Sequence, residues 1–236
     1  MTVGIMQPYF APYIGYISLI KHTDQFILFD PVQFIRHGWI ERNRILKQNG
    51  GWLYIQVPLV KSGREALIKD MQIDNTPDWK AKILAQLQPY KKIAPFYFKV
   101  IAILNQVFEK EYHSIVKLNQ ALLEAICAYL GFAKELPIFS EMNIAIDTPT
   151  EADEWALNIC KKLGDNITYI NPIGGLEFFN KDKYSKNNIN IYFQKMQITE
   201  YNQKRNPFES GLSILDVMMF NSPEEINEML DQFELI

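Results

Sequence analysis

The sequence predicts an α/β fold in which a parallel sheet is combined with a helical subdomain in the middle of the chain. Three observations lead to this class. A strand–helix–strand pattern opens the chain, helical periodicity alone fills residues 76–131, and the alternation of helices and strands resumes after residue 150. With 236 residues, 48% of them hydrophobic, the chain can form a single α/β domain over residues 1–236 that contains this subdomain.

The opening pattern predicts a βαβ unit. Thr2–Met6 is a short apolar run, and Pro8 and Pro12 then turn the chain into a helix over residues 12–22. Gln25–Phe29 is a second apolar run of strand length. Two strands joined by one helix in this way are parallel, and open α/β sheets bind ligands beyond the carboxyl ends of such strands. The loops that follow these two strands are therefore the first candidate site.

A hairpin is predicted next. Ile40–Leu46 and Trp52–Pro58 have strand composition, and Gln-Asn-Gly-Gly between them is favoured in hairpin turns. Thr150 and Asp153 predict a capping box at the start of a later helix, and Ser213 and Asp216 predict another. The remaining predicted elements are a strand over 68–73, helices over 79–90, 94–108, 114–130 and 150–163, strands over 168–170 and 189–193, and helices over 213–220 and 224–233.

Composition excludes several classes of protein. The formal net charge of −3 argues against a nucleic-acid partner, which requires a basic surface. Polar residues and prolines interrupt residues 1–20, and no apolar run has the length of a membrane span, so we expect a cytoplasmic protein. Cys127 and Cys160 lie on apolar helical patterns and are expected to be buried thiols. The three histidines are scattered, so no metal site is expected, and a homo-oligomer stays open.

The first candidate loop is the segment QPYFAPYIGY, residues 7–16. Its expected ligand contacts are Gln7, Tyr13, Gly15 and Tyr16, with Gly15 early in a helix whose amides attract a phosphate. The layout is similar to that of the nucleotidyltransferase and class I synthetase (HUP) superfamily, which implies a Rossmann-like sheet. Members carry His-x-Gly-His where this chain has Tyr13-Ile14-Gly15-Tyr16, and tyrosine supplies no imidazolium charge. The alternative is that the tyrosines pack and that Gly15 only allows close helix contact.

The second candidate loop, Asp30–Trp39, and the predicted strand that follows it to Leu46 contain the densest basic cluster of the chain. Guanidinium groups match the geometry of phosphates and carboxylates, and Arg42 and Arg44 share one face of the predicted strand. The alternative is a solvated strand face on which Glu41 pairs with an arginine. Asp30 or His37 would accept a proton from the attacking group, a role that His37 fits better unless Asp30 is buried. The expected ligand contacts of this block are Gln33, Arg36, Trp39, Arg42, Asn43 and Arg44.

A third loop, Asn171–Gly175, follows the strand at 168–170. Gly174 and Gly175 are expected to contact the ligand through the backbone. The alternative is a turn that only needs a positive φ angle.

Five segments together resemble the WbqC-like protein family: residues 7–16, 29–46, 52–59, 79–97 and 212–221. Members occur among genes for bacterial surface polysaccharide, especially O-antigen, and glycine (aminoacyl) transferases have been suggested among them. The resemblance therefore implies a transferase that acylates or aminoacylates the amine of a nucleotide-linked amino sugar. The sequence departs from the family at Lys82-Ile83, where a Lys-His pair is common, and at Ile170-Asn171, where Ser-Gly is common.

Two alternatives remain beside the transferase. One is a non-catalytic protein that binds a nucleotide-sugar or supports assembly in the same pathway, which the missing histidines favour. The other is a nucleotidyltransferase, which would need the cationic side chains that Tyr13 and Tyr16 replace. In each case the partner is a small-molecule nucleotide or nucleotide-sugar. ATP with Mg²⁺ would suit activation of a donor, and a preactivated donor would suit the sequence equally well.

Overall fold

A mixed five-stranded sheet forms the centre of the protein in a computed structural model that describes residues 1–48, 50–204 and 207–236. The strand order is β2-β1-β5-β6-β7, with parallel pairing throughout except between β6 and β7. The α/β class and the mostly parallel sheet are therefore confirmed. The strands are β1 (Thr2–Met6), β2 (Gln25–Leu28), β5 (Thr168–Pro172), β6 (Asn190–Met196) and β7 (Phe233–Leu235).

The strand order reverses beside β1. The chain leaves β1 through α1 (Ile14–Lys21) to reach β2 on one side, and β5 later pairs with the other side of β1. Gly4 accordingly lies in register with Phe26 on one neighbour and with Ile170 on the other. Loops that follow β1 and β5 must diverge at such a reversal, and the divergence leaves a crevice beyond the carboxyl ends of the strands.

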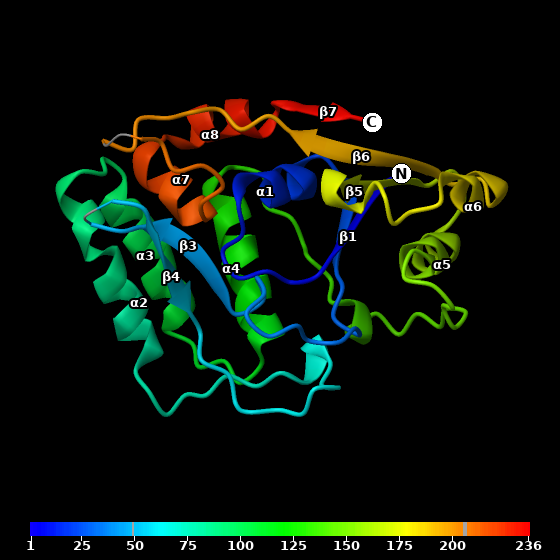
Figure 1. Cartoon of the computed structure of the whole chain (residues 1–236), viewed down its shortest axis with the longest axis horizontal. Coiled ribbons are helices and arrows are strands. Elements are labelled where there is room, and N and C mark those ends of the chain that lie inside the picture. The colour runs from blue at the N-terminus through cyan, green and yellow to red at the C-terminus, as the bar shows by residue number, and fades with distance from the viewer. Residues whose placement is uncertain (49, 205–206) are drawn as a thin grey trace.

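Helices cover both faces of this sheet, as Figure 1 shows. Along β2 the side chains alternate: Phe26 and Leu28 join one hydrophobic cluster, whereas Ile27 and the following Phe29 join the other. The first cluster is shared with α1, α7 (Ile214–Phe220) and α8 (Pro223–Leu230), and the second with α5 (Glu154–Leu163) and α6 (Lys181–Lys186). Within the described ranges, no helix combines the length and the apolar composition that crossing a bilayer requires.

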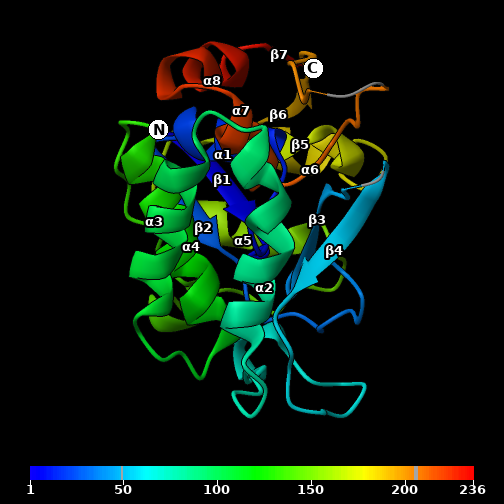
Figure 2. The same cartoon turned by 90° about the vertical axis from the view of Figure 1, so that its left-hand side faces the viewer.

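The middle of the chain extends the first cluster away from the sheet. It contributes the hairpin β3 (Arg42–Leu46) and β4 (Trp52–Gln56), and the helices α2 (Trp79–Leu87), α3 (Tyr97–Phe108) and α4 (Ile115–Tyr129). The hairpin lies beside α2 in Figure 2. The predicted hairpin turn includes Asn49, which lies outside the described residues. The three helices were predicted, and the division into a domain and a subdomain stays a prediction.

Several predicted boundaries are wrong. Helix α2 ends at Leu87, where a 3-10 helix over Gln88–Lys92 takes over, because Pro89 cannot donate a helical hydrogen bond. The predicted strand over 68–73 is a 3-10 helix, Ile68–Asp70, followed by isolated bridges at Gln72 and Ile73. The predicted last helix ends at Leu230, and the chain then forms β7.

The two predicted capping boxes are also wrong in detail. Asp153, not Thr150, is the N-cap of α5, and Thr150 instead donates two hydrogen bonds to the Glu154 carboxylate, at 2.7 and 2.8 Å. Ser213 does cap α7 by accepting from the amide of Leu215. Asp216, however, is fully buried and accepts hydrogen bonds from tyrosine hydroxyls of distant segments rather than from the cap.

Candidate functional site

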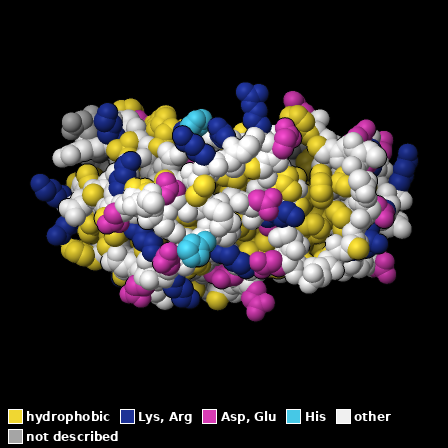
Figure 3. Space-filling model, turned by 90° about the horizontal axis from the view of Figure 1, so that it is seen from below, with side chains coloured by type: hydrophobic (Ala, Val, Ile, Leu, Met, Phe, Trp, Pro, Cys, Tyr) yellow, Lys and Arg dark blue, Asp and Glu magenta, His cyan; other side chains and the backbone are white. Residues whose placement is uncertain are grey.

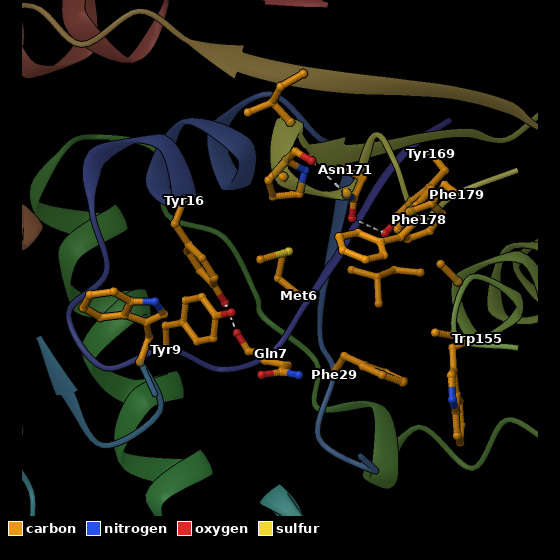
Figure 4. Close-up of a pocket in the computed structure, with 18 of the residues that line it drawn as sticks. Met6, Gln7, Tyr9, Tyr16, Phe29, Trp155, Tyr169, Asn171, Phe178 and Phe179 are labelled. Atoms are coloured by element: carbon orange, nitrogen blue, oxygen red, sulfur yellow. Dashed lines mark hydrogen bonds between the residues drawn. The ribbon is translucent and has the colours of Figure 1, made fainter. Parts of the chain in front are cut away.

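A cavity of about 650 Å³ lies beyond the carboxyl ends of β1, β2 and β5, at the point where the strand order reverses. We call it the main cavity. Figure 4 shows side chains from these strand ends, from the loop after β1 and from α5 around one space. From below, Figure 3 shows a band of hydrophobic side chains in the half of the molecule that carries α5 and α6 in Figure 1. The cavity is in the place where a doubly wound sheet would bind a ligand.

The wall of the main cavity is aromatic and uncharged. None of the described residues that line it is an Asp, Glu, Lys, Arg or His. Phe178, whose side chain is exposed to 74%, stands at the edge of this space. Such a wall suits an uncharged ring, which can stack on aromatic faces, and it offers no counter-ion to an isolated charge. The aromatic lining residues are Tyr9, Tyr13, Tyr16, Phe29, Trp39, Trp155, Tyr169, Phe178 and Phe179.

A few polar groups face the main cavity. The hydroxyl of Tyr16 donates to the carbonyl of Gln7 at 2.8 Å, whereas the Gln7 amide and the hydroxyls of Tyr9 and Tyr13 make no hydrogen bond to another described residue. Burial raises the pKa of Tyr9 and of Tyr13, and the proximity of Tyr13 raises that of Tyr9 further. Both hydroxyls therefore keep their protons at neutral pH and can donate to a ligand.

Gly15 acts on this wall indirectly. It does not line the main cavity, and a Cβ atom built on it would lie 2.5 Å from a ring carbon of Tyr13. The absence of a side chain thus lets the Tyr13 ring lie against the start of α1. This contact agrees with the alternative interpretation, in which Gly15 allows close packing.

The glycine loop after β5 forms the opposite wall. Asn171 is locked there, because its Oδ1 accepts from the Tyr169 hydroxyl at 2.8 Å and its Nδ2 donates to the carbonyl of Pro172 at 2.9 Å. A Cβ on Gly175 would lie 1.9 Å from this Nδ2 atom, whereas a Cβ on Gly174 would meet nothing within 4 Å. Neither glycine has a positive φ angle. Close approach of Asn171, and not turn geometry, therefore explains the glycine at 175.

A second compartment, of about 340 Å³, shares Tyr9, Tyr13 and Trp39 with the main cavity. We call it the arginine compartment, because Arg44 also lines it. Asn43 lies in its wall with the side chain occupied: Nδ2 donates to the carbonyl of Phe10 at 3.2 Å, and Oδ1 accepts from the amide of Arg44 at 2.8 Å. Among the described residues that line the two compartments, Arg44 is the one with a cationic side chain.

The predicted arginine cluster is divided among several places. Arg36 and His37 line a separate pocket of about 180 Å³, where Arg36 donates to the carbonyl of Ser62 at 2.6 Å. The backbone of His37 has a φ angle of 61° and donates its N–H to the carboxylate of Glu41 at 2.9 Å. Arg42 donates to the carbonyl of His37, and its guanidinium carbon lies 4.0 Å from the ring centre of Tyr54. No arginine of the described ranges pairs with Glu41.

The two expected proton acceptors do not line the main cavity. Asp30 is 1% exposed and accepts two hydrogen bonds from Ser140, from the amide at 3.0 Å and from the hydroxyl at 2.6 Å. His37 belongs to the separate pocket. Gln33 is also elsewhere, since its amide donates to the carbonyl of Arg64 at 2.7 Å. The structure therefore brings Gln7, Tyr13, Tyr16, Trp39, Gly174 and Gly175 into one cavity, and leaves Asp30, Gln33, Arg36, His37 and Arg42 outside it.

One buried side chain ties the first two candidate loops together. Nδ2 of Asn119, on α4, donates to the carbonyls of Pro8 and of Ile40, both at 2.8 Å. The amide of Phe10 also donates to the carbonyl of Trp39 at 2.9 Å. These bonds hold the loops after β1 and before β3 as one wall. Sequence reasoning missed Asn119, and it also missed Tyr9, Asn171, Trp155, Phe178 and Phe179 as lining residues.

Comparisons with known proteins identify a family and name no activity. A model of the WbqC-like protein family matches residues 7–228. An uncharacterized protein of Mycobacterium tuberculosis (strain ATCC 25618 / H37Rv), Rv1507c, is 29% identical over 231 residues, which cover 97% of this chain and 96% of that protein. No solved structure matches the chain. In the described part of the chain, no group of three or more His, Cys, Asp or Glu side chains could hold a metal ion.

Proposed function

The chain belongs to the WbqC-like protein family, and we propose that it binds a nucleotide-linked sugar with a ring of the ligand in the main cavity. The uncharged aromatic cavity at the reversal of the strand order is the observation that carries this proposal. Open α/β sheets bind nucleotides at that place, and a Rossmann-like relation to the nucleotidyltransferase superfamily is part of the proposal. Synthesis of bacterial surface polysaccharide is the setting that the family resemblance implies.

The side chains that line the main cavity favour a ring-shaped, uncharged ligand group rather than a small charged metabolite. The volume of about 650 Å³ lies in the range of small-molecule sites. A base or a pyranose ring can stack on aromatic faces such as those of Tyr9 and Trp155, and its hydroxyl and carbonyl groups can bind the free amide of Gln7. A lone carboxylate or ammonium group would be desolvated in the main cavity without a counter-ion.

A thermal-shift panel tests this proposal. Uridine, thymidine and guanosine, with UDP-, dTDP- and GDP-linked sugars, are added to the wild-type protein and to Gly174→Phe. A ligand that binds only the native state at 100 times its Kd stabilises it by about 2.7 kcal/mol. We expect at least one nucleoside series to raise the unfolding midpoint.

The Gly174→Phe variant fills the cavity from a position where a Cβ meets nothing within 4 Å, so it should fold and lose the shift. Gly174→Ala is the matched control and should keep the shift. The proposal fails if no compound raises the midpoint at millimolar concentration, or if Gly174→Phe responds like the wild type.

A second candidate is the acyl or aminoacyl transferase. The main cavity and the arginine compartment meet at Tyr9, Tyr13 and Trp39. This arrangement favours a transferase, because a donor in one compartment could lie beside an acceptor in the other. In that reaction the amine of the sugar forms a bond to the acyl carbon, the bond to the leaving group breaks, and a base takes the amine proton. The main cavity shows no carboxylate or imidazole among its described lining residues, so binding ranks first.

Mass spectrometry separates the two candidates. The protein is incubated with a UDP-linked amino sugar, glycine, ATP and Mg²⁺. A gain of one glycyl residue on the sugar that is lost in Gly174→Phe supports the transferase. An unchanged sugar, under conditions in which the thermal shift shows binding, supports the binding protein.

A further inference from the structure

Arg44 has an incomplete set of partners. Its Nη2 atom donates to the carbonyl of Gly211 at 3.0 Å, whereas its Nε atom is buried and has no hydrogen-bond partner in the described part of the chain. The guanidinium carbon lies 5.6 Å from the ring centre of Trp39 and 5.3 Å from that of Trp52. No described carboxylate forms an ion pair with it.

This environment leaves the charge of Arg44 uncompensated. A half-buried guanidinium loses part of its hydration, and the loss is repaid when an anion and its hydrogen bonds are supplied. Two aromatic rings at these distances stabilise a cation only weakly and do not replace a counter-ion. Lys183 shows the contrast on the same molecule, since it contacts the carboxylates of Glu151, Asp153 and Glu154.

We propose that Arg44 binds a phosphoryl group of the same ligand whose ring occupies the main cavity. The inference rests on the proposed function, and it divides the ligand into an uncharged part in the main cavity and an anionic part in the arginine compartment. The two compartments share Tyr9, Tyr13 and Trp39, so one molecule can reach from the first into the second. Arg36 and Arg42, which were predicted to share this role, do not line either compartment.

The donors around the arginine compartment fit a phosphoryl group. The hydroxyls of Tyr9 and Tyr13 make no hydrogen bond to a described residue, and with Arg44 they provide three donor side chains for the terminal oxygens. A carboxylate offers two oxygens and is small for a compartment of about 340 Å³. No described acidic side chain lines this compartment, so binding should not depend on a divalent metal.

Titration calorimetry of matched ligands tests this assignment. The nucleoside that raises the unfolding midpoint is compared with its 5′-monophosphate on the wild type, on Arg44→Gln and on Arg42→Gln, in EDTA. We expect the monophosphate to bind about 10- to 100-fold more tightly to the wild type, as charge-assisted hydrogen bonds would give. In Arg44→Gln this gain should disappear while the nucleoside keeps its Kd.

Arg42→Gln is the matched control, because it removes the same charge from the same strand at a position outside both compartments. It should keep the phosphate gain. The assignment to Arg44 would be overturned if the phosphate increased the affinity equally in the wild type and in Arg44→Gln. It would also be overturned if Arg44→Gln and Arg42→Gln lost the same part of this increase. Failure of every nucleoside and nucleotide to bind would overturn the proposed function itself, whereas nucleoside binding without a phosphate gain would overturn only this inference.

Discussion

Alanine at position 175 should destabilise the protein, whereas alanine at position 174 should not. The new Cβ on residue 175 would lie 1.9 Å from Nδ2 of Asn171, and 3.1 Å from its Cγ and from a ring carbon of Phe179. Asn171 cannot swing away freely, because it is 7% exposed and hydrogen bonds to Tyr169 and Pro172 hold both ends of its amide. The substitution must therefore break at least one of these bonds or move the glycine loop.

The magnitude follows from the two hydrogen bonds. Losing both costs about 1–3 kcal/mol, since each contributes about 0.5–1.5 kcal/mol. Glycine-to-alanine replacement returns about 0.4–1 kcal/mol by restricting the unfolded chain, because the φ angle at 175 is not in the left-handed region. The free energy of unfolding of Gly175→Ala should thus fall by about 0–2.6 kcal/mol relative to wild type and lie about 1–3 kcal/mol below that of Gly174→Ala, which shares the same return. That of Gly174→Ala should be unchanged or rise by less than about 1 kcal/mol.

Urea unfolding followed by circular dichroism measures both variants against the wild type. The two substitutions change neighbouring residues in the same way, so a difference between them reports the contact with Asn171. Binding of the nucleoside should also weaken in Gly175→Ala, because the displaced amide belongs to the wall of the main cavity. Equal free energies of unfolding for the two variants would refute this account of the glycine loop.

Three further predictions concern buried groups. Asn119→Ala should lower the free energy of unfolding in urea by about 2–4 kcal/mol, because two carbonyls lose a buried donor. An unchanged value would contradict the role of Asn119 in joining the two loops. Burial raises the pKa of Glu41, so the folded state holds its proton more tightly than the unfolded state and the wild type loses stability as pH rises above about 4.3. Glu41→Gln has no titrating carboxyl at this position, so the melting midpoint of the variant minus that of the wild type should increase from pH 4 to pH 7. A difference that does not change with pH would contradict the raised pKa of Glu41. Burial raises the pKa of Cys127 and Cys160 to about 12. A thiol reagent at pH 7.5 should therefore label neither cysteine until guanidinium unfolds the protein. Rapid labelling of the native protein would contradict their burial.

The part of the site that follows from topology could be predicted from the sequence. Apolar runs of strand length, interrupted by Pro8 and Pro12, indicate a βαβ unit. Because carboxyl ends of parallel strands meet at one edge of a sheet, this pattern was enough to expect the site in the loop that begins at Gln7. The pairing of β5 with β1, which brings the glycines at 174 and 175 to the same cavity, joins segments that are far apart in the sequence. The helices α3 and α4 were predicted for the same kind of reason, since their apolar residues recur at helical spacing over several turns.

The distribution of the arginines could not be predicted in this way. Sequence spacing places Arg36, Arg42 and Arg44 close together, yet a turn with a positive φ angle at His37 separates Arg36 from the strand. The alternation along β3 then gives Arg42 and Arg44 one general direction, and their partners, the carbonyls of His37 and Gly211, decide the final positions. Such partners depend on loop conformation, which local propensity does not specify.

Contacts between distant segments account for the other differences. Asp30 follows a strand, as many catalytic carboxylates do, but Ser140 occupies both of its oxygens from 110 residues away. Trp155 and Phe178 reach the main cavity only because α5 and the loop after β5 flank its mouth. No periodicity within either segment marks these residues as lining a site. The short elements α6 and β7 were missed because they are six and three residues long.

A crystal structure with the nucleotide-linked sugar that gives the largest thermal shift tests the central claim most directly. We expect density for an uncharged ring of the ligand in the main cavity, in contact with Tyr9 and the loop at Gly174, and for a phosphoryl group in hydrogen-bond contact with Arg44. Density for the saturating ligand in the pocket of Arg36 and His37, or an empty main cavity in that crystal, would contradict the claim.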